Sequence, residues 1–225
     1  MANNILLVLG GAWHDFDEFE ATLSPILRNE GYNLEATRDH TCFAELHNSS
    51  IDAVLLYTSL GNTFDGKRHG KDLKPGQTKA LRQWVRNGKG LLGVHGASIS
   101  AKENRSYREL IGGRFEKHPK PFEFTLYPFH TRNQFTKGIA PFAVADEFYL
   151  HNSNTDVEIC LGALYKDEVH PMAWSRQEGS GHVAYLSPGH FPAVWNNEIW
   201  QTILLRMLAW CTATKSTAQA GTKTE

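Results

Sequence analysis

The first hundred residues alternate between short apolar runs and longer amphipathic stretches. The apolar runs carry few polar residues, which is typical of strands buried on both faces of a parallel sheet. The amphipathic stretches repeat their apolar positions at helical spacing and end in glycine. Such alternation predicts βαβ units with right-handed crossovers, and Pro25 is expected to kink or divide the first helix. The expected strands span 4–10, 32–38, 51–59 and 90–96, and the expected helices span 15–31 and 75–88.

The pattern changes after residue 105. A helical stretch breaks at Gly112-Gly113, and several later segments alternate apolar and polar positions as half-exposed strands do. A buried strand is expected to return over 181–190, followed by a long helix over 196–211. The second half therefore predicts an antiparallel insertion or an extension at the edge of the sheet. Its expected strands span 121–129, 146–151, 158–165 and 170–176.

The composition fits one globular α/β domain. The chain has 225 residues, of which 41% are hydrophobic and 21% are charged, so it can build a sizeable core. We expect one domain over residues 1–214 and a disordered polar tail over residues 215–225. The sequence lacks the apolar run of about 20 residues that would span a membrane.

Charge and cysteine content argue against several kinds of partner. The formal net charge is −1, so no basic excess predicts binding to nucleic acid or to a membrane surface. Cys42, Cys160 and Cys211 are scattered, which predicts neither a disulfide framework nor a zinc knuckle. The N-terminal residues are typical of a strand rather than a signal peptide. We therefore expect a cytoplasmic protein that acts on a small molecule, with a homo-oligomer left open.

The segment GVHGAS, residues 93–98, places His95 between two glycines, after an apolar run and before an expected helix. In open α/β sheets, ligands bind at the carboxyl ends of the strands. Hydrolases with a strand–turn–helix of this kind carry a serine or cysteine nucleophile at the apex. A histidine there can be a general base, a hydrogen-bond donor or a metal ligand, or it can simply fill a turn. His14 and His190 also follow expected strands, so we expect His190 to lie close to His95.

Five segments taken together resemble the ThuA-like (trehalose utilisation) family. They are, in order, GVHGAS, GGRFEKHP, FTKGIAPFAVADEFY, HPMAWSRQEGSGHVAYLSPGH and the tryptophan-rich last helix. The resemblance covers roughly residues 4–212. It implies a fold of the class I glutamine amidotransferase-like superfamily, which is a flavodoxin-like three-layer α/β sandwich with a mostly parallel central sheet.

The same resemblance argues against amidotransfer. In glutamine amidotransferases the elbow residue is a cysteine that a histidine after a late strand activates, whereas this chain has His95 and His190 at those positions. The missing elbow cysteine also argues against a protease or deglycase of related fold. The resemblance instead implies carbohydrate metabolism, because ThuA-like proteins often accompany dehydrogenases that oxidise a disaccharide to its 3-keto form.

That association implies a lyase or hydrolase that cleaves an oxidised glycoside such as 3-keto-trehalose. A ketone at C3 acidifies the hydrogen at C2, so cleavage by elimination needs a base, an oxyanion stabiliser and an acid. The ordinary structural alternatives are a turn or a helix cap for the candidate histidines, a solvated strand end for Glu147 and the core for the two candidate tryptophans. The candidate catalytic residues are His95, Glu147, His118 and His190, and the candidate substrate-binding residues are His14, Trp13, Tyr149 and Trp195.

Two alternatives remain open from the residues. A divalent metal, Zn or Mn, could assist the histidines, with His95, His118 and His190 as candidate ligands, although no local spacing such as H-E-x-x-H marks a site. The alternative to an enzyme is a non-catalytic sugar-binding or sensing module. A cleft that gathers His95, His190 and Glu147 would favour the enzyme, because a binder needs no set of titratable groups that converge on one point.

Overall fold

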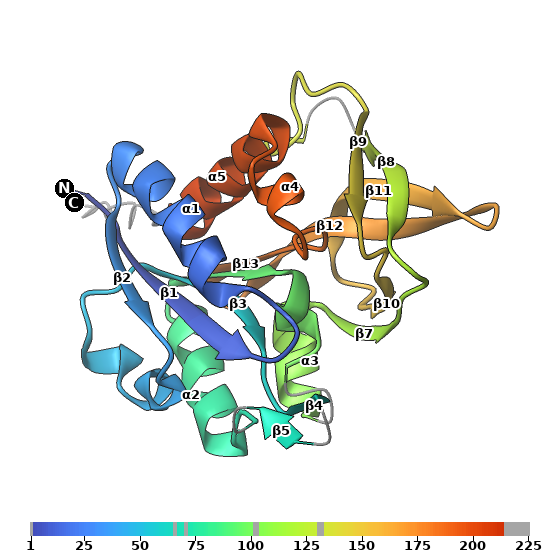
Figure 1. Cartoon of the computed structure of the whole chain (residues 1–225). Helices are drawn as coiled ribbons and strands as arrows, with labels where there is room; N and C mark the ends of the chain where they lie inside the picture. The colour runs from blue at the N-terminus through green and yellow to red at the C-terminus, as the bar shows by residue number, and fades with distance from the viewer. Residues whose placement is uncertain (1, 65–66, 70–71, 101–103, 130–132, 214–225) are drawn as a thin grey trace, which may run out of the picture.

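A nine-stranded sheet forms the centre of the computed structural model, which describes residues 2–64, 67–69, 72–100, 104–129 and 133–213 (Figure 1). The strand order is β2-β1-β3-β6-β13-β12-β11-β8-β9. The first five of these strands pair in parallel, and the last four continue the sheet by antiparallel pairing. The expected α/β fold, with a mostly parallel sheet and an antiparallel extension, is therefore confirmed.

The parallel half consists of the apolar runs that the sequence pattern indicated. Every residue of β3 and β6 is buried, because helices cover both faces of this part of the sheet. The parallel strands are β1 (Asn4–Gly11), β2 (Asn33–Thr37), β3 (Ala53–Ser59), β6 (Gly90–Val94) and β13 (Gly181–Leu186).

Four helices cover the two faces of the parallel half. Figure 1 shows α1 (Phe16–Asn29) and α5 (Glu198–Thr212) on one face, and α2 (Pro75–Arg86) and α3 (Arg105–Ile111) on the other. Two apolar clusters match this division. Phe19, Leu23 and Leu27 of α1 join the first cluster, whereas Leu81 and Trp84 of α2 join the second. The result is the expected three-layer sandwich.

Local sequence signals set the helix ends. The Asp15 side chain accepts a hydrogen bond from the Glu18 amide and caps α1, while Asn197 caps α5 in the same way. Gly112 ends α3 in the left-handed conformation that glycine adopts most easily. Helix α1 continues through Pro25, so of the two expected effects, a kink or a division of the helix, the division does not occur.

The antiparallel half consists of β8 (Phe122–Pro128), β9 (Phe142–Asp146), β11 (Glu158–Tyr165) and β12 (Glu168–Glu178). The expectation of one strand over 146–151 is wrong. Strand β9 ends at Asp146, residues 147–149 belong to no strand, and β10 (Leu150–Ser153) pairs with β7 (Gly113–Lys117) instead. Glu147 and Tyr149 therefore lie on a connection between two sheets, not on one face of a strand.

Short elements complete the fold. They are the hairpin of β4 (Asn62–Phe64) and β5 (Lys67–His69), the short helix α4 (Pro192–Trp195) and the 3₁₀-helices His40–Ala44, Leu46–Asn48 and His95–Ser98. The expected disordered tail over 215–225 lies outside the described residues. No helix in the described ranges is long and apolar enough to cross a membrane.

A substitution at Gly90 of β6 tests how closely α5 packs on the sheet. A Cβ atom at Gly90 would lie 2.1 Å from the Cys211 carbonyl oxygen, whereas one at Gly76 of α2 would meet nothing within 4 Å. We expect Gly90→Ala to lower the free energy of unfolding by about 1–3 kcal/mol through overpacking. Gly76→Ala should leave it unchanged or raise it by up to ~1 kcal/mol. Urea unfolding measures both, and equal stabilities for the two variants would contradict the packing.

Candidate active site

Three histidines meet at the carboxyl edge of the parallel strands. His14 follows β1, His95 follows β6 and His190 follows β13. The ring centroids are 5.0 Å apart for His14 and His95, 4.9 Å for His14 and His190, and 5.3 Å for His95 and His190. The expectation that His95 and His190 lie close together is confirmed.

His95 occupies a strained turn. It directly follows β6, as expected, and begins a 3₁₀-helix with a backbone φ of 44°, a conformation that non-glycine residues rarely adopt. Its side chain is fully buried, and Nδ1 donates to the Ser187 carbonyl oxygen at 2.8 Å. A Cβ atom at Gly96 would lie 2.8 Å from the Thr58 carbonyl oxygen and 3.1 Å from the His14 ring, so this turn requires a glycine beside the histidine.

His14 is held by the backbone before it. Its Nδ1 donates to the Ala12 carbonyl oxygen at 2.7 Å. Burial lowers the pKa of His14 to about 3, and repulsion from His95 and His190 adds to the effect. His14 is therefore a neutral imidazole at neutral pH. The sequence had suggested it as a substrate-binding residue, and the structure places it within the histidine cluster.

Asp146 positions the loop that carries His190, and sequence reasoning missed it. Its buried carboxylate accepts hydrogen bonds from the amides of Gly189, at 2.6 Å, and His190, at 3.1 Å. Burial raises the pKa of Asp146 despite these contacts. A signal was present, because the alternation of β9 places this acid on the inward face that Phe142 and Val144 share.

Glu147 contacts three histidines through its two carboxylate oxygens. Oε2 lies 3.4 Å from His95 Nε2 and 3.2 Å from His190 Nδ1, and Oε1 lies 3.6 Å from His118 Nε2. Burial opposes ionisation of this side chain, but the contacts with His190 and His95 outweigh it and hold the pKa of Glu147 well below its usual range. The site therefore contains an ionised carboxylate next to several imidazoles.

A cavity of about 470 Å³ opens over this cluster, which is within the usual size of small-molecule pockets. Tyr149 is almost fully buried and stacks on His95, with ring centroids 4.1 Å apart. The Trp13 side chain is 43% exposed at the rim. The residues that line the cavity are Trp13, His14, Ile99, Phe115, His118, Glu147, Tyr149 and His190.

Trp195 is not among the residues that line the cavity. It is fully buried in the apolar cluster, and its indole donates to the Gly189 carbonyl oxygen at 2.6 Å. This placement does not support Trp195 as a substrate-binding residue, and instead indicates that the side chain supports the loop before His190. Large aromatic residues are more often part of the core than a platform for a ligand, and Trp195 is a core residue.

A polar network lies behind His95. Tyr185 donates to the His95 carbonyl oxygen at 2.7 Å, and Ser98 donates to the same oxygen at 3.2 Å. His151 Nε2 lies 3.1 Å from the Ser98 hydroxyl and 3.2 Å from that of Tyr185. Burial lowers the pKa of His151 to about 3. The two bonds to the His95 carbonyl oxygen stabilise the strained turn that carries this residue.

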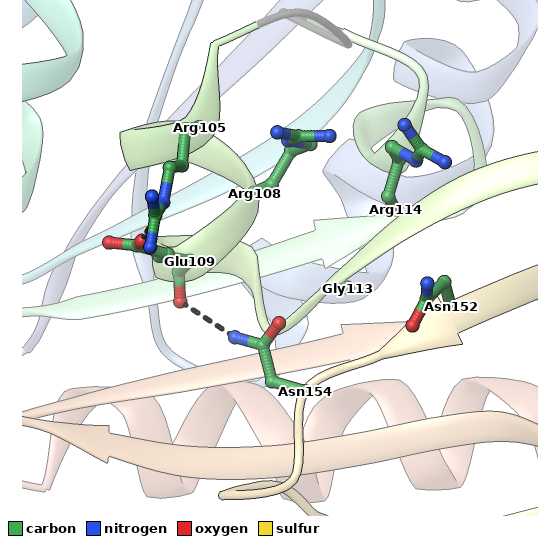
Figure 2. Close-up of a pocket in the computed structure, with 7 residues that line it drawn as sticks. All are labelled: Arg105, Arg108, Glu109, Gly113, Arg114, Asn152 and Asn154. Carbon is green, nitrogen blue, oxygen red and sulfur yellow. Dashed lines mark hydrogen bonds and ion pairs between the residues drawn. The ribbon is translucent and has the colours of Figure 1, made fainter.

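A second hollow lies away from the histidines, between α3 and strands β7 and β10 (Figure 2). Arg105 and Arg114 line it, but Arg105 pairs with Glu109 and Arg114 pairs with Glu116. Exposed ion pairs of this kind are typical of a solvated surface. This hollow is therefore a weaker candidate for a catalytic site than the histidine cluster.

Comparison with known protein families gives one decisive match. The ThuA family model, described as trehalose utilisation, matches residues 4–211. The chain belongs to the ThuA family. The match spans both halves of the sheet and every candidate site residue. A comparison with curated proteins finds no match.

Solved structures of ThuA-like proteins have the same fold. One from Parabacteroides merdae has a TM-score of 0.76 at 17% identity, covering 96% of this chain and 92% of that chain. One from Bacteroides uniformis has a TM-score of 0.72 at 19% identity, covering 93% and 91%. A cytoplasmic protein from Salmonella typhimurium has a TM-score of 0.65 at 14% identity, covering 92% and 98%. The TM-scores, over more than nine-tenths of each chain, establish the shared fold, which is consistent with a flavodoxin-like sandwich.

The depressed pKa of His151 predicts a sensitivity to acid. An unfolded chain binds a proton at this residue near pH 6.5, whereas the folded protein binds it only near pH 3, so stability is lost as the pH falls between these values. We expect His151 to account for a loss of about 2 kcal/mol in the free energy of unfolding between pH 7 and pH 5. Urea unfolding of His151→Gln at both pH values should show a correspondingly smaller loss.

The matched control is His47→Gln, because His47 is exposed. This variant should lose stability with pH as the unmodified protein does. If His151→Gln and the unmodified protein lost the same free energy between pH 7 and pH 5, the neutral buried state of His151 would be refuted.

Proposed function

We propose that this ThuA-family protein is a carbohydrate enzyme that cleaves an oxidised glycoside, with 3-keto-trehalose as the representative substrate. The family description supports the connection to sugar metabolism. The observation that carries the proposal is the convergence of Glu147 with His95, His118 and His190 beside one cavity. A sugar-binding module would not need so many titratable groups at one point.

The reaction follows from the acidity of the hydrogen next to a ketone. A base removes the proton from C2, and the electron pair of that bond moves to form an enolate with the C3 carbonyl. The C1–O bond then breaks as a C1=C2 double bond forms, and an acid protonates the departing glycosidic oxygen. This completes the lyase reaction, and addition of water across the double bond would give the hydrolysis products.

Glu147 is our candidate for the base. Carboxylates perform this task in other enzymes that remove a proton next to a carbonyl. Its side chain is 13% exposed and lines the cavity, so a substrate can reach it. The acidity of Glu147 makes it a weak base, and the reaction therefore depends on stabilisation of the enolate. His95 and His190, which contact the same carboxylate, are the candidates for that role.

His118 is our candidate for the acid. Its side chain is 34% exposed at the cavity, and Nδ1 donates to the Pro119 carbonyl oxygen at 2.8 Å. With Nδ1 fixed as a donor, Nε2 is the nitrogen free to exchange a proton with the leaving group. Trp13, exposed at the rim, is the candidate platform for the apolar face of a sugar ring.

Amidotransfer and cysteine-dependent hydrolysis are disfavoured by the same geometry. The chain's three cysteines are absent from the lining of the cavity. Burial raises the pKa of Cys160 to about 12 and that of Cys42 to about 11, which suppresses the reactive thiolate. Three free thiols also fit the cytoplasmic location that we propose.

Activity on 3-keto-trehalose and on trehalose tests the proposal. We expect cleavage of the keto sugar only, and a slower reaction when C2 carries deuterium, provided that removal of this hydrogen limits the rate. Glu147→Gln and His95→Ala should each lower kcat by at least ~10²-fold, the usual worth of a catalytic base for Glu147 and of an enolate-stabilising group for His95. His47→Ala, a change at an exposed histidine, should leave kcat unchanged.

Two results would overturn the proposal. Equal rates on the oxidised and unoxidised disaccharide would remove the ketone from the mechanism. Undiminished turnover by folded Glu147→Gln would remove the carboxylate as the base. Circular dichroism of each variant shows that a loss of activity is not a loss of folding.

A further inference from the structure

Three histidine nitrogens converge inside the site. One ring nitrogen from each of His14, His95 and His190 lies within 4.8 Å of the other two. His14 Nε2, His95 Nε2 and His190 Nδ1 are buried, and within the described residues none of them reaches the geometry of a hydrogen bond, although Glu147 Oε2 lies 3.4 Å from His95 Nε2 and 3.2 Å from His190 Nδ1. Buried polar atoms in native proteins are nearly always hydrogen-bonded, so three buried ring nitrogens without a well-formed hydrogen bond in one place call for a common explanation.

The hydrogen bonds behind two of the rings fix which nitrogen carries the proton. The Nδ1 atoms of His14 and His95 face the carbonyl oxygens of Ala12, at 2.7 Å, and Ser187, at 2.8 Å. A carbonyl oxygen only accepts, so each Nδ1 is the protonated nitrogen. In the neutral ring, Nε2 then presents a lone pair to the cluster. Metal-binding histidines are oriented in this way by a backbone or carboxylate acceptor.

The surroundings of the cluster suit a transition-metal cation. Glu147 Oε2 lies within 3.4 Å of both His95 Nε2 and His190 Nδ1, which places a negative charge beside the three rings. Imidazole nitrogens favour Zn²⁺ and its neighbours, whereas Mg²⁺ and Ca²⁺ prefer oxygen ligands. Three histidines that leave an open position are typical of catalytic rather than structural zinc sites.

We propose that His14, His95 and His190 together bind one divalent transition-metal ion of the Zn²⁺ type, with Glu147 beside it. Zn–N bonds are about 2.0–2.1 Å long, so binding would draw the three rings together. His14, His190 and Glu147 line the cavity, so the open position of the ion faces the space where a substrate would lie.

This ligand set differs from the one that the sequence suggested. His14 takes the place of His118, which faces the other oxygen of Glu147 at 3.6 Å and is not part of the converging group. The difference makes the two histidines a matched pair for an experiment, because both line the same cavity and only His14 is a proposed ligand.

A role for the ion in catalysis rests on the proposed function, whereas its binding does not. When bound, the ion would act as a Lewis acid for the ketone oxygen and for the enolate that forms from it. His95 and His190 would then act by holding the ion, and Glu147 would remain beside it as the base.

Metal binding can be measured on the full chain, purified without a histidine tag and stripped with a chelator. We expect titration with Zn²⁺ to give one ion per chain by mass spectrometry of the metal, and to raise the Tm. His14→Ala and His190→Ala should each weaken binding by at least ~10²-fold, since loss of an outer-shell partner alone costs 10–100-fold. His118→Ala and the exposed-site variant His47→Ala should retain the ion.

Binding of Co²⁺ to the unmodified protein supplies a readout that needs no variant to fold. We expect visible absorption bands of a nitrogen-ligated ion, which Zn²⁺ should abolish by competition. Failure of the unmodified protein to bind either ion would overturn the site. Undiminished binding by folded His14→Ala, or loss of binding in folded His118→Ala, would overturn the ligand set.

Failure of the metal site and failure of the proposed function would look different. Stoichiometric binding by a protein that cleaves no keto sugar would leave the site standing and reject the function. Full activity of the stripped protein on 3-keto-trehalose would keep the function and reject the catalytic role of the ion.

Discussion

The parallel alignment of β1, β3, β6 and β13 is the constraint on which the site depends. Their registers place Leu9 beside Tyr57, Leu56 beside Gly93, and Val94 beside Leu186, so the four strands end at one edge. The residues that follow must then meet there. Hydrogen bonds tie these ends together in turn, from the Ala12 amide to Ser59 and from the His95 ring to the Ser187 carbonyl oxygen. Segments far apart in sequence thereby become neighbours.

The antiparallel half contributes the charge that the histidines lack. Strand β9 is at the outer end of the sheet, yet the chain beyond it leaves the sheet and runs back to the histidines. Two adjacent carboxylates then have separate roles. Asp146 is fully buried and holds the backbone of the His190 loop, whereas Glu147 contacts the imidazole rings at the cavity. The extension is therefore a part of the site and not only an addition to the fold.

Much of the fold was predictable because it depends on local patterns. Buried apolar runs and capped amphipathic helices are visible in sequence, and so is the tight turn at His95. The segment 147–149 was not predictable, because its aromatic residues Phe148 and Tyr149 favour a strand while the chain in fact crosses between two sheets. Local periodicity does not report which sheet a segment joins.

The site was predictable as a set of residues but not as an arrangement. The order of strands in a parallel sheet brings His95 and His190 to one edge, and this follows from fold class alone. That His14, and not His118, joins these two histidines does not follow from fold class, because it depends on the direction of the side chains. Trp195 shows the same limit, since only the packed structure reveals that its indole faces the core rather than the cavity.

Backbone strain distinguishes the site from the rest of the described chain. Among the described residues, Trp13, His95, Lys166 and Asp167 have positive φ without being glycine. Lys166 and Asp167 form the two-residue turn between β11 and β12, where tight hairpins require this conformation. No such turn accounts for Trp13 and His95. Both instead lie where a strand ends and a histidine must point back over the sheet edge. The strain is thus best understood as the cost of aiming His14 and His95 at a common point, offset by the hydrogen bonds that surround each turn.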